Sequence, residues 1–190
     1  MGKVMKICKP FKNANPKSIT QMFSQAHQAV DFAGNYGEDL VAPFNAIVVN
    51  VVESIDEQTI DENKDDLRRG YGVKLRSVEE PSLSISFWHN LPIHPVEKGE
   101  FILQGTPVGE MGNNGWVESN GKVVDIDLRT IPPFPGTHCH ITFGQTNPDG
   151  SYTPLDYLKY IDWNIPINYD VATFLRLMFK NILRLLQKPV

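Results

Sequence analysis

The chain has only two cysteines, Cys8 and Cys139, among its 190 residues. Small secreted domains that depend on disulfides are much richer in cysteine, so that class of scaffold is excluded. One disulfide is compatible with two cysteines, but a chain of this length can bury a sizeable core without any. Because 41% of the residues are hydrophobic and 21% are charged, the composition predicts a soluble globular protein.

The sequence also lacks a positive charge excess, a long apolar run and a secretory signal. The formal net charge is −4, which disfavours nucleic acid as the main partner because phosphate binding requires a basic surface. No stretch approaches the roughly 18 apolar residues of a membrane-spanning helix. Lys3 and Lys6 are not followed by a sufficient apolar run before Pro10, so we do not expect the start to act as a secretory signal. If the substrate lies outside a membrane, three explanations stay open. The protein could be a phage product, it could pass through a secretion machine, or its export signal could have been trimmed from the sequence.

The residue pattern mainly favours β-strands. Residues 71–77 and 83–88 alternate apolar and polar side chains, which predicts strands with one buried face. Frequent glycines between 98 and 115 suit tight turns. Further strands are expected at 40–53, with Pro43 near its start, at 123–128 and at 137–143. The sequence therefore predicts a mainly β fold, built as a small antiparallel β-sheet in a barrel or sandwich.

Two segments depart from this texture. Residues 54–69 are almost entirely polar and predict a solvated loop between strands. Residues 171–187 carry apolar side chains at helical spacing, which predicts a C-terminal amphipathic helix. Its cations recur every four residues, at Arg176, Lys180, Arg184 and Lys188. Two roles stay open for this helix: docking on the β domain or another copy, and resting at an interface with anionic lipid or a protein partner.

The segment Thr137–Phe143 carries the strongest chemical signal. Alternate side chains of a strand share a face, so His138 and His140 point the same way. Cys139 then points into the core, which argues against its sulfur as a metal ligand. Two imidazoles on one β surface suit a single metal, or one metal and one general base.

Two further elements are weak when taken alone. His27 and Asp31 are four residues apart, which places both side chains on one face of a helix or a strand. Imidazole and carboxylate are both good zinc donors. His89 ends an alternating strand and, taken by itself, is better explained as a half-buried histidine with a satisfied ring nitrogen than as a catalytic one.

Taken in order, these elements resemble the lysostaphin-type, or LytM-type, zinc metalloendopeptidases. The order is His27-x-x-x-Asp31, an aromatic-x-His element ending at His89, and Gly136-Thr-His-Cys-His140. The segment 40–48 is similar to the family's Val-x-Ala-Pro-x-x-Gly-x-Val strand, with Ala46 in place of its glycine. The segment 96–115 is similar to the family's glycine-rich stretch that ends in Gly-Asn-Thr-Gly. The resemblance covers about residues 20–160.

The resemblance implies a role for each matched residue. His27, Asp31 and His140 would bind one Zn²⁺ ion per chain, and His89 and His138 would be catalytic without being ligands. Three protein ligands leave the fourth position open for water, as a catalytic zinc site requires. The division of labour between His89 and His138 is left open.

The resemblance, together with the composition of the segments on either side of it, predicts a domain organisation. An irregular leader at 1–19 would precede the peptidase domain at 20–160, and a helical extension would follow at 161–190. Residues 116–135 have no counterpart in the family, and we expect this insertion to form a hairpin-like flap beside the groove. Within it, Asp125 and Asp127 are expected on a solvated strand face, not in a second metal site. His94 also lacks a counterpart and is expected to be a surface or loop histidine.

The function implied is zinc-dependent hydrolysis of peptide bonds in peptidoglycan stem or cross-bridge peptides, at the cell wall or in the periplasm. One alternative is a catalytically silent relative that binds cell-wall peptide or a cell-wall enzyme. A less favoured alternative is a phosphocarrier-type β domain, which would use paired histidines without metal. The bond cleaved and the oligomeric state are not indicated by the sequence.

Overall fold

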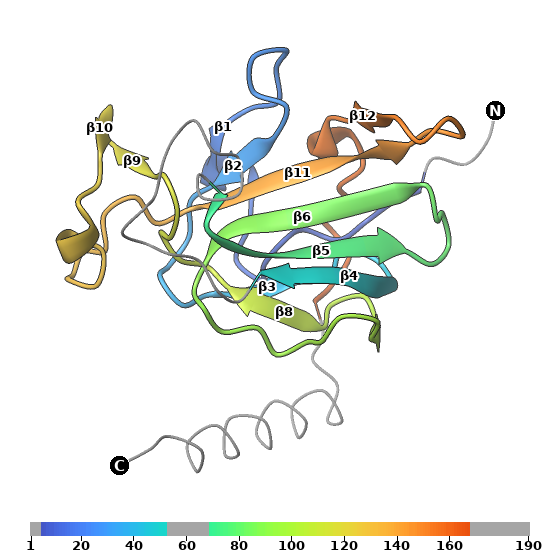
Figure 1. The fold of residues 1–190 in the computed structure, drawn as a ribbon, viewed down its shortest axis with the longest axis horizontal. Coiled ribbons are helices and arrows are strands. Elements are labelled where there is room, and N and C mark those ends of the chain that lie inside the picture. Colours follow the sequence, from blue (N-terminus) through green and yellow to red (C-terminus); the bar gives the residue numbers. More distant parts are fainter. Residues whose placement is uncertain (1–4, 53–68, 168–190) are drawn as a thin grey trace, which may run out of the picture.

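The computed structural model describes residues 5–52 and 69–167 (Figure 1). Its regular structure consists of short and medium strands with a few 3-10 turns, and every named strand pair is antiparallel. The predicted mainly β, antiparallel fold class is therefore confirmed. The polar segment 54–68 and the amphipathic segment 171–187 lie outside the described residues. No helix in the described part of the chain is long and apolar enough to cross a membrane.

One eight-stranded sheet forms the body of the fold. Its order is β1 (Ile19–Gln21), β2 (Val30–Phe32), β11 (Cys139–Thr146), β6 (Leu83–Asn90), β5 (Tyr71–Ser77), β4 (Ala46–Val52) and β7 (Phe101–Ile102), with β12 (Tyr152–Pro154) also paired to β11. A second pair joins β3 (Asp39–Val41) to β8 (Pro107–Glu110), and a small hairpin joins β9 (Glu118–Ser119) to β10 (Lys122–Val123). The 3-10 turns are η1 (Pro16–Ser18), η3 (Ile126–Leu128) and η4 (Tyr157–Lys159).

The predicted strands agree with these elements except at two places. The expected strand 40–53 is divided, because β3 pairs with β8 whereas β4 pairs with β5 and β7. The expected strand 123–128 is wrong beyond Val123. Asp125 instead caps η3, and its Oδ1 accepts a hydrogen bond from the backbone N–H of Asp127 at 3.2 Å. A short acidic side chain that bonds its own backbone favours a turn over a strand.

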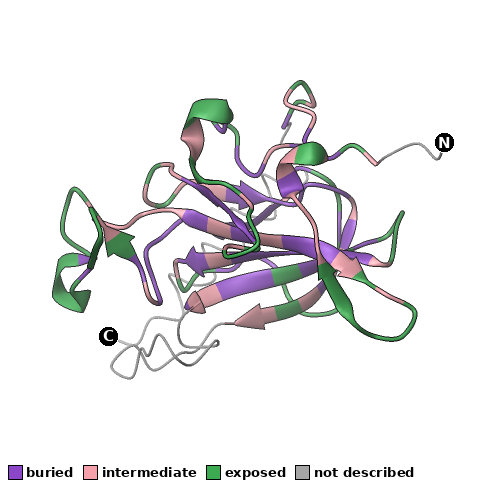
Figure 2. Ribbon diagram, turned by 90° about the horizontal axis from the view of Figure 1, so that it is seen from above, coloured by how far each residue is buried: buried purple, intermediate pink, exposed green. Residues whose placement is uncertain are grey.

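The core lies on the face of the central sheet that the odd-numbered residues of β6 and β11 share. Ile85, Phe87, Ile141 and Phe143 are all buried there, and buried residues concentrate along the central strands in Figure 2. Each such side chain contributes on the order of 1.5–3 kcal/mol when removed from water. The even-numbered residues therefore face the opposite side of the sheet, where His140 lies.

The N-terminal segment joins this core. Ile7 and Phe11 are buried, and Ile7 forms an isolated bridge with Ile161. The segment has little regular structure, as expected for 1–19, but residues on both sides of the expected boundaries at 19 and 160 pack into one hydrophobic cluster. The division of the chain into leader, peptidase domain and extension stays a prediction.

Candidate metal centre

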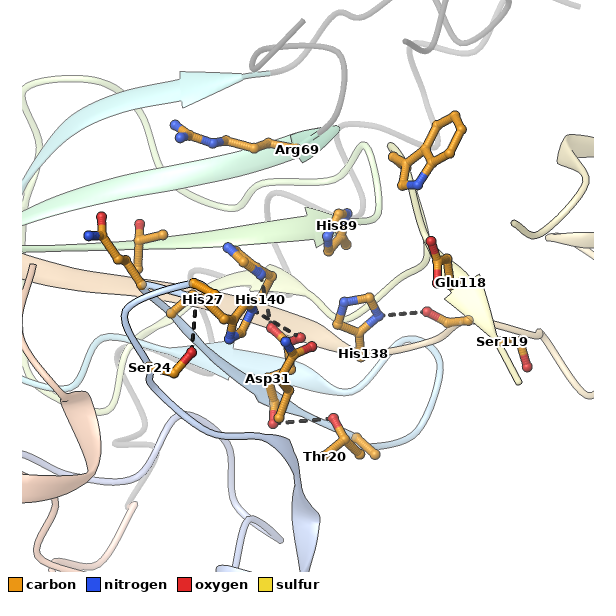
Figure 3. Close-up of a pocket in the computed structure, with 18 of the residues that line it drawn as sticks. Thr20, Ser24, His27, Asp31, Arg69, His89, Glu118, Ser119, His138 and His140 are labelled. Atoms are coloured by element: carbon orange, nitrogen blue, oxygen red, sulfur yellow. Dashed lines mark hydrogen bonds and ion pairs between the residues drawn. The ribbon is translucent and has the colours of Figure 1, made fainter. Parts of the chain in front are cut away.

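Pairing between two strands brings two of the expected zinc ligands together. Asp31 on β2 and His140 on β11 are direct partners in the antiparallel register. His27 precedes β2 in a turn, where its backbone N–H bonds Ser24 Oγ at 3.0 Å and its carbonyl accepts the N–H of Ser24 at 2.9 Å. This turn, not a helix or strand face, returns the His27 ring towards Asp31 (Figure 3).

The three side chains converge on one point. His140 Nδ1 lies 2.9 Å from Asp31 Oδ1, and His27 Nε2 lies 3.4 Å from Asp31 Oδ2. One donor atom from each residue lies within 4.8 Å of the others, and the described residues hold no other such group. Ligands bound tetrahedrally at zinc distances are separated by about 3.4 Å. The sequence-predicted ligands are therefore placed together at a spacing that a metal can bridge.

The carboxylate of Asp31 supports a cation at this point. Its Oδ1 is buried and has no hydrogen-bond partner of proper geometry, despite the short distance to His140 Nδ1. A buried carboxylate oxygen without a partner is costly, and a bound cation removes that cost. Burial raises the pKa of Asp31, but the neighbouring His140, His138 and His27 lower it more, so the pKa lies below its ordinary value. The residues present fit zinc, since two imidazoles and one carboxylate leave the fourth position open.

His138 and His89 stand beside this group with their rings oriented by backbone carbonyls. His138 Nδ1 lies 2.8 Å from Gly136 O, and His89 Nδ1 lies 2.6 Å from Asn114 O. A carbonyl can only accept, so each Nδ1 carries the proton and each Nε2 is the acceptor nitrogen of a neutral ring. Burial is the main cause that lowers the pKa of both rings, that of His89 well below its ordinary range. Both imidazoles are therefore neutral near pH 7.

His89 reaches the site through an irregularity of its strand. Tyr71 pairs with Asn90 and Gly72 with Trp88, so His89 is an extra residue on β6 and forms a β-bulge. Its φ of 64° lies in the left-handed region, which few residues other than glycine adopt. Strict alternation would place His89 with Phe87 on the core face. The bulge turns the ring instead towards His138, with ring centroids 4.6 Å apart, and towards His140, at 5.7 Å.

The prediction for Cys139 agrees with the structure. Cys139 is buried with a free thiol, whereas His138 and His140 are only partly buried and line the same pocket. His138 itself lies just before β11 and not within it. The alternation that places Cys139 on one face and the two histidines on the other is therefore kept at the start of β11.

The site opens into a cleft of about 1110 Å³. Polar side chains of the 20–28 segment form one wall, and the insertion contributes another through Trp116, Glu118, Ser119 and Asn120. The expected hairpin of the insertion is therefore present as β9–β10 and lies on the histidine side. Thr142 and Arg69 line the cleft along the sheet, and Figure 3 labels Arg69. The Arg69 guanidinium lies 5.4 Å from the Trp88 ring centroid.

Three residues of the site region were not predicted from sequence. Asn114 orients His89, although its only signal was its place in Gly112-Asn-Asn-Gly115, where the family has threonine. Arg69 belongs to the segment that was expected to be a solvated loop. The burial of His94 was also not expected: it lies in a loop, one of the two places expected for it, but it is only 2% exposed and its Nε2 is 3.4 Å from Asn90 Nδ2. Asp125 and Asp127 are exposed, as expected.

No protein-family model matches the sequence, and neither does any curated protein. Solved structures do. The structure of Csd3 from Helicobacter pylori is similar over 96% of this chain and 42% of that chain, with 16% identity and a TM-score of 0.53. LytU matches with 17% identity over 72% of this chain and 77% of that chain, with a TM-score of 0.49. The catalytic domain of lysostaphin from Staphylococcus simulans matches with 16% identity over 70% and 77% of the two chains, with a TM-score of 0.47.

The similarity to Csd3 shows a shared fold. This chain spans less than half of the length of Csd3. At 16% identity, this similarity shows the fold and not the activity, and membership of the lysostaphin-type peptidase family stays a prediction.

Proposed function

We propose that this chain is a zinc-dependent endopeptidase that hydrolyses peptide bonds of peptidoglycan stem or cross-bridge peptides at the cell wall or in the periplasm. The observation that carries the proposal is the convergence of His27, Asp31 and His140, which each place one possible ligand atom within 4.8 Å of the other two. Beside this group lie two further histidines whose orientation suits proton transfer. The substrate class follows from the resemblance of the sequence motifs to cell-wall peptidases, and the open polar cleft has room for a peptide.

His27 would bind the zinc ion through Nε2, and His140 through Nδ1, because these are the nitrogens that face Asp31. The other nitrogen of His27, Nδ1, lies 3.4 Å from Met22 O, a carbonyl that fixes the ring. A bound zinc ion would supply a water of lowered pKa, about 7, and would polarise the scissile carbonyl.

His89 and His138 would handle protons and charge around the scissile bond. Each presents an unprotonated Nε2 and holds its Nδ1 proton on a carbonyl, so each can accept a proton without turning its ring. Once protonated, either ring can donate to the leaving amine or stabilise a developing oxyanion. Low pKa values keep both rings ready to accept at neutral pH.

The proposal is tested by digesting purified peptidoglycan from several wall types with the full chain, with and without a chelator, and identifying new termini by mass spectrometry. We expect new peptide termini with the zinc-loaded chain and none after chelation. Restoring zinc should restore them. Products that are insensitive to the chelator, or no products from any wall type, would contradict it. A silent relative would instead bind wall peptides without cleaving them.

A further inference from the structure

Residues 113–115 form a junction between the insertion and His89. His89 Nδ1 donates to Asn114 O at 2.6 Å, and the Asn114 side-chain amide donates to Asn90 O, also at 2.6 Å. Asn114 therefore makes two hydrogen bonds to the end of β6, one to the ring of His89 and one to the backbone of Asn90. The direction of the His89 ring depends on where the Asn114 peptide lies.

A buried arginine of the insertion fixes the same junction from its other side. Arg129 is 6% exposed, and its Nη1 donates to Gly115 O at 2.6 Å. Its Nη2 donates to Val124 O at 3.1 Å. Hydrogen bonds from a charged donor are stronger than neutral ones, and the planar guanidinium holds its donors in fixed directions. One side chain thus ties the residue that follows Asn114 to the far end of the β9–β10 hairpin.

Asn113 makes the connection reciprocal. Its buried side-chain amide donates to Arg129 O at 3.1 Å and to Pro135 O at 2.9 Å. The Asn113 side chain binds the backbone of Arg129, and the Arg129 side chain binds the backbone of Gly115. Removing the guanidinium would leave the buried carbonyls of Gly115 and Val124 each short of a donor, which is costly away from water. Such a cost favours a shift of residues 113–115.

We propose that Arg129 is a positioning residue for His89: it fixes the peptide whose carbonyl orients the catalytic ring, and so makes the insertion part of the catalytic machinery. The inference rests on the proposed function, since His89 has a catalytic role only there. The zinc ligands lie on β2, on β11 and in the turn before β2. Arg129 should therefore affect turnover and not metal binding.

The test compares Arg129→Met with Arg76→Met, which removes an exposed arginine of β5 outside the cleft. On a soluble cross-linked muropeptide, we expect Arg129→Met to lower kcat by about 10–100-fold, as loss of a supporting hydrogen bond typically does. KM should change by less than about threefold, and zinc affinity, measured against a chelating dye, by less than about twofold. Arg76→Met should match the wild type in all three.

A second readout follows the His89 Nδ1 proton by NMR in the full chain. We expect its exchange with solvent to be at least about tenfold faster in Arg129→Met than in the wild type or Arg76→Met. Wild-type exchange, or wild-type kcat, in folded Arg129→Met would overturn the proposal. If Arg129→Met does not fold, Arg129→Lys takes its place, because a single ammonium group cannot donate to both carbonyls as the guanidinium does. A wild-type kcat and wild-type exchange in Arg129→Lys would overturn the proposal. A lower kcat with faster exchange would support it. If the wild type cleaves no peptide, the proposed function fails, while the exchange measurement still reports on Arg129.

Discussion

Asp31 and His140 are opposite one another in the pairing of β2 with β11, and the Oδ1 and Nδ1 atoms of their side chains lie 2.9 Å apart. The pairing register sets this distance, and His27 approaches the other carboxylate oxygen from a separate turn. Asp31 and His140 therefore share one structural support, and His27 has another. This separation allows the contributions of the ligands and of the neighbouring histidines to be tested one at a time.

The first prediction concerns the carboxylate. Asp31→Asn keeps the size of the side chain but removes the negative charge that faces both imidazoles. We expect zinc affinity to fall by at least about 100-fold, because a neutral amide is a much weaker zinc ligand than a carboxylate. Competition with a chelating dye measures the change. Asp127→Asn, at an exposed position in the insertion, is the matched control and should bind zinc as the wild type does.

The second prediction separates the proposed zinc ligands from the proposed catalytic histidines. His138→Ala should still bind one zinc ion per chain, since His138 lies outside the group formed by His27, Asp31 and His140. Its kcat should fall by about 10²–10⁴-fold, the usual contribution of a general acid or base. Metal analysis of the purified variant and peptide hydrolysis together test this. A variant that loses its zinc would place His138 among the ligands.

A third prediction concerns stability. A ligand that binds only the folded chain stabilises it, by about 4 kcal/mol when present at a thousand times its Kd. For a chain of this size, each kcal/mol shifts Tm by roughly 2–4 °C. We therefore expect Tm to fall by about 8–16 °C when zinc is removed by a chelator. In His140→Ala the chelator should have little effect, and an equal fall in both proteins would indicate an effect unrelated to this site.

The fourth prediction concerns alkaline pH. Burial raises the pKa of the Cys8 thiol to about 12, and the thiol donates to Ala42 O at 3.6 Å. In the unfolded chain this thiol ionises near pH 9, so the unfolded state loses its proton first as pH rises. The stabilising contribution is complete below pH 9 and is lost between pH 9 and 12.

Urea unfolding at pH 8 and pH 10 measures this effect. Cys8 should lower the free energy of unfolding by about 1.4 kcal/mol at pH 10 relative to pH 8. Cys139 is buried as well and its pKa is also raised, so Cys8→Ala should remove only part of the alkaline loss. An unchanged dependence on pH in Cys8→Ala would contradict the assignment.

Much of the ligand group could be predicted from the sequence, because it depends on simple periodicity. Alternation along β11 separates His140 from Cys139 whatever the rest of the fold does. The spacing of His27 and Asp31 was informative for a different reason than expected, since a turn and not a shared face brings them together. Their proximity to His140 depends on the pairing of distant strands, which only the family resemblance suggested.

Other features could not be predicted from periodicity. His89 faces the site because of a bulge and a left-handed backbone, and both depend on the pairing of β6 with β5. The strand expected at 123–128 failed because an Asp125 cap outweighed the alternating pattern. Arg129 gave no sequence signal of burial, since its partners are backbone carbonyls 14 and 5 residues away. Backbone partners leave no mark in the side-chain pattern of a sequence.

The position of His27, Asp31 and His140 near one end of the sheet affects how easily that end of the sheet unfolds. β1 and β2 are only three residues long each, and β1 is the terminal strand of the sheet. A metal bound by His27, Asp31 and His140 would cross-link this short margin to the long central strand β11. Without metal, β1 and the turn before β2 are held by few backbone bonds and would fray first, exposing a strand edge that can pair with other chains. β2 itself is anchored in the core by Val30 and Phe32. Expression in zinc-poor medium would then yield aggregation and proteolytic nicking near residues 19–28 before any loss of the core.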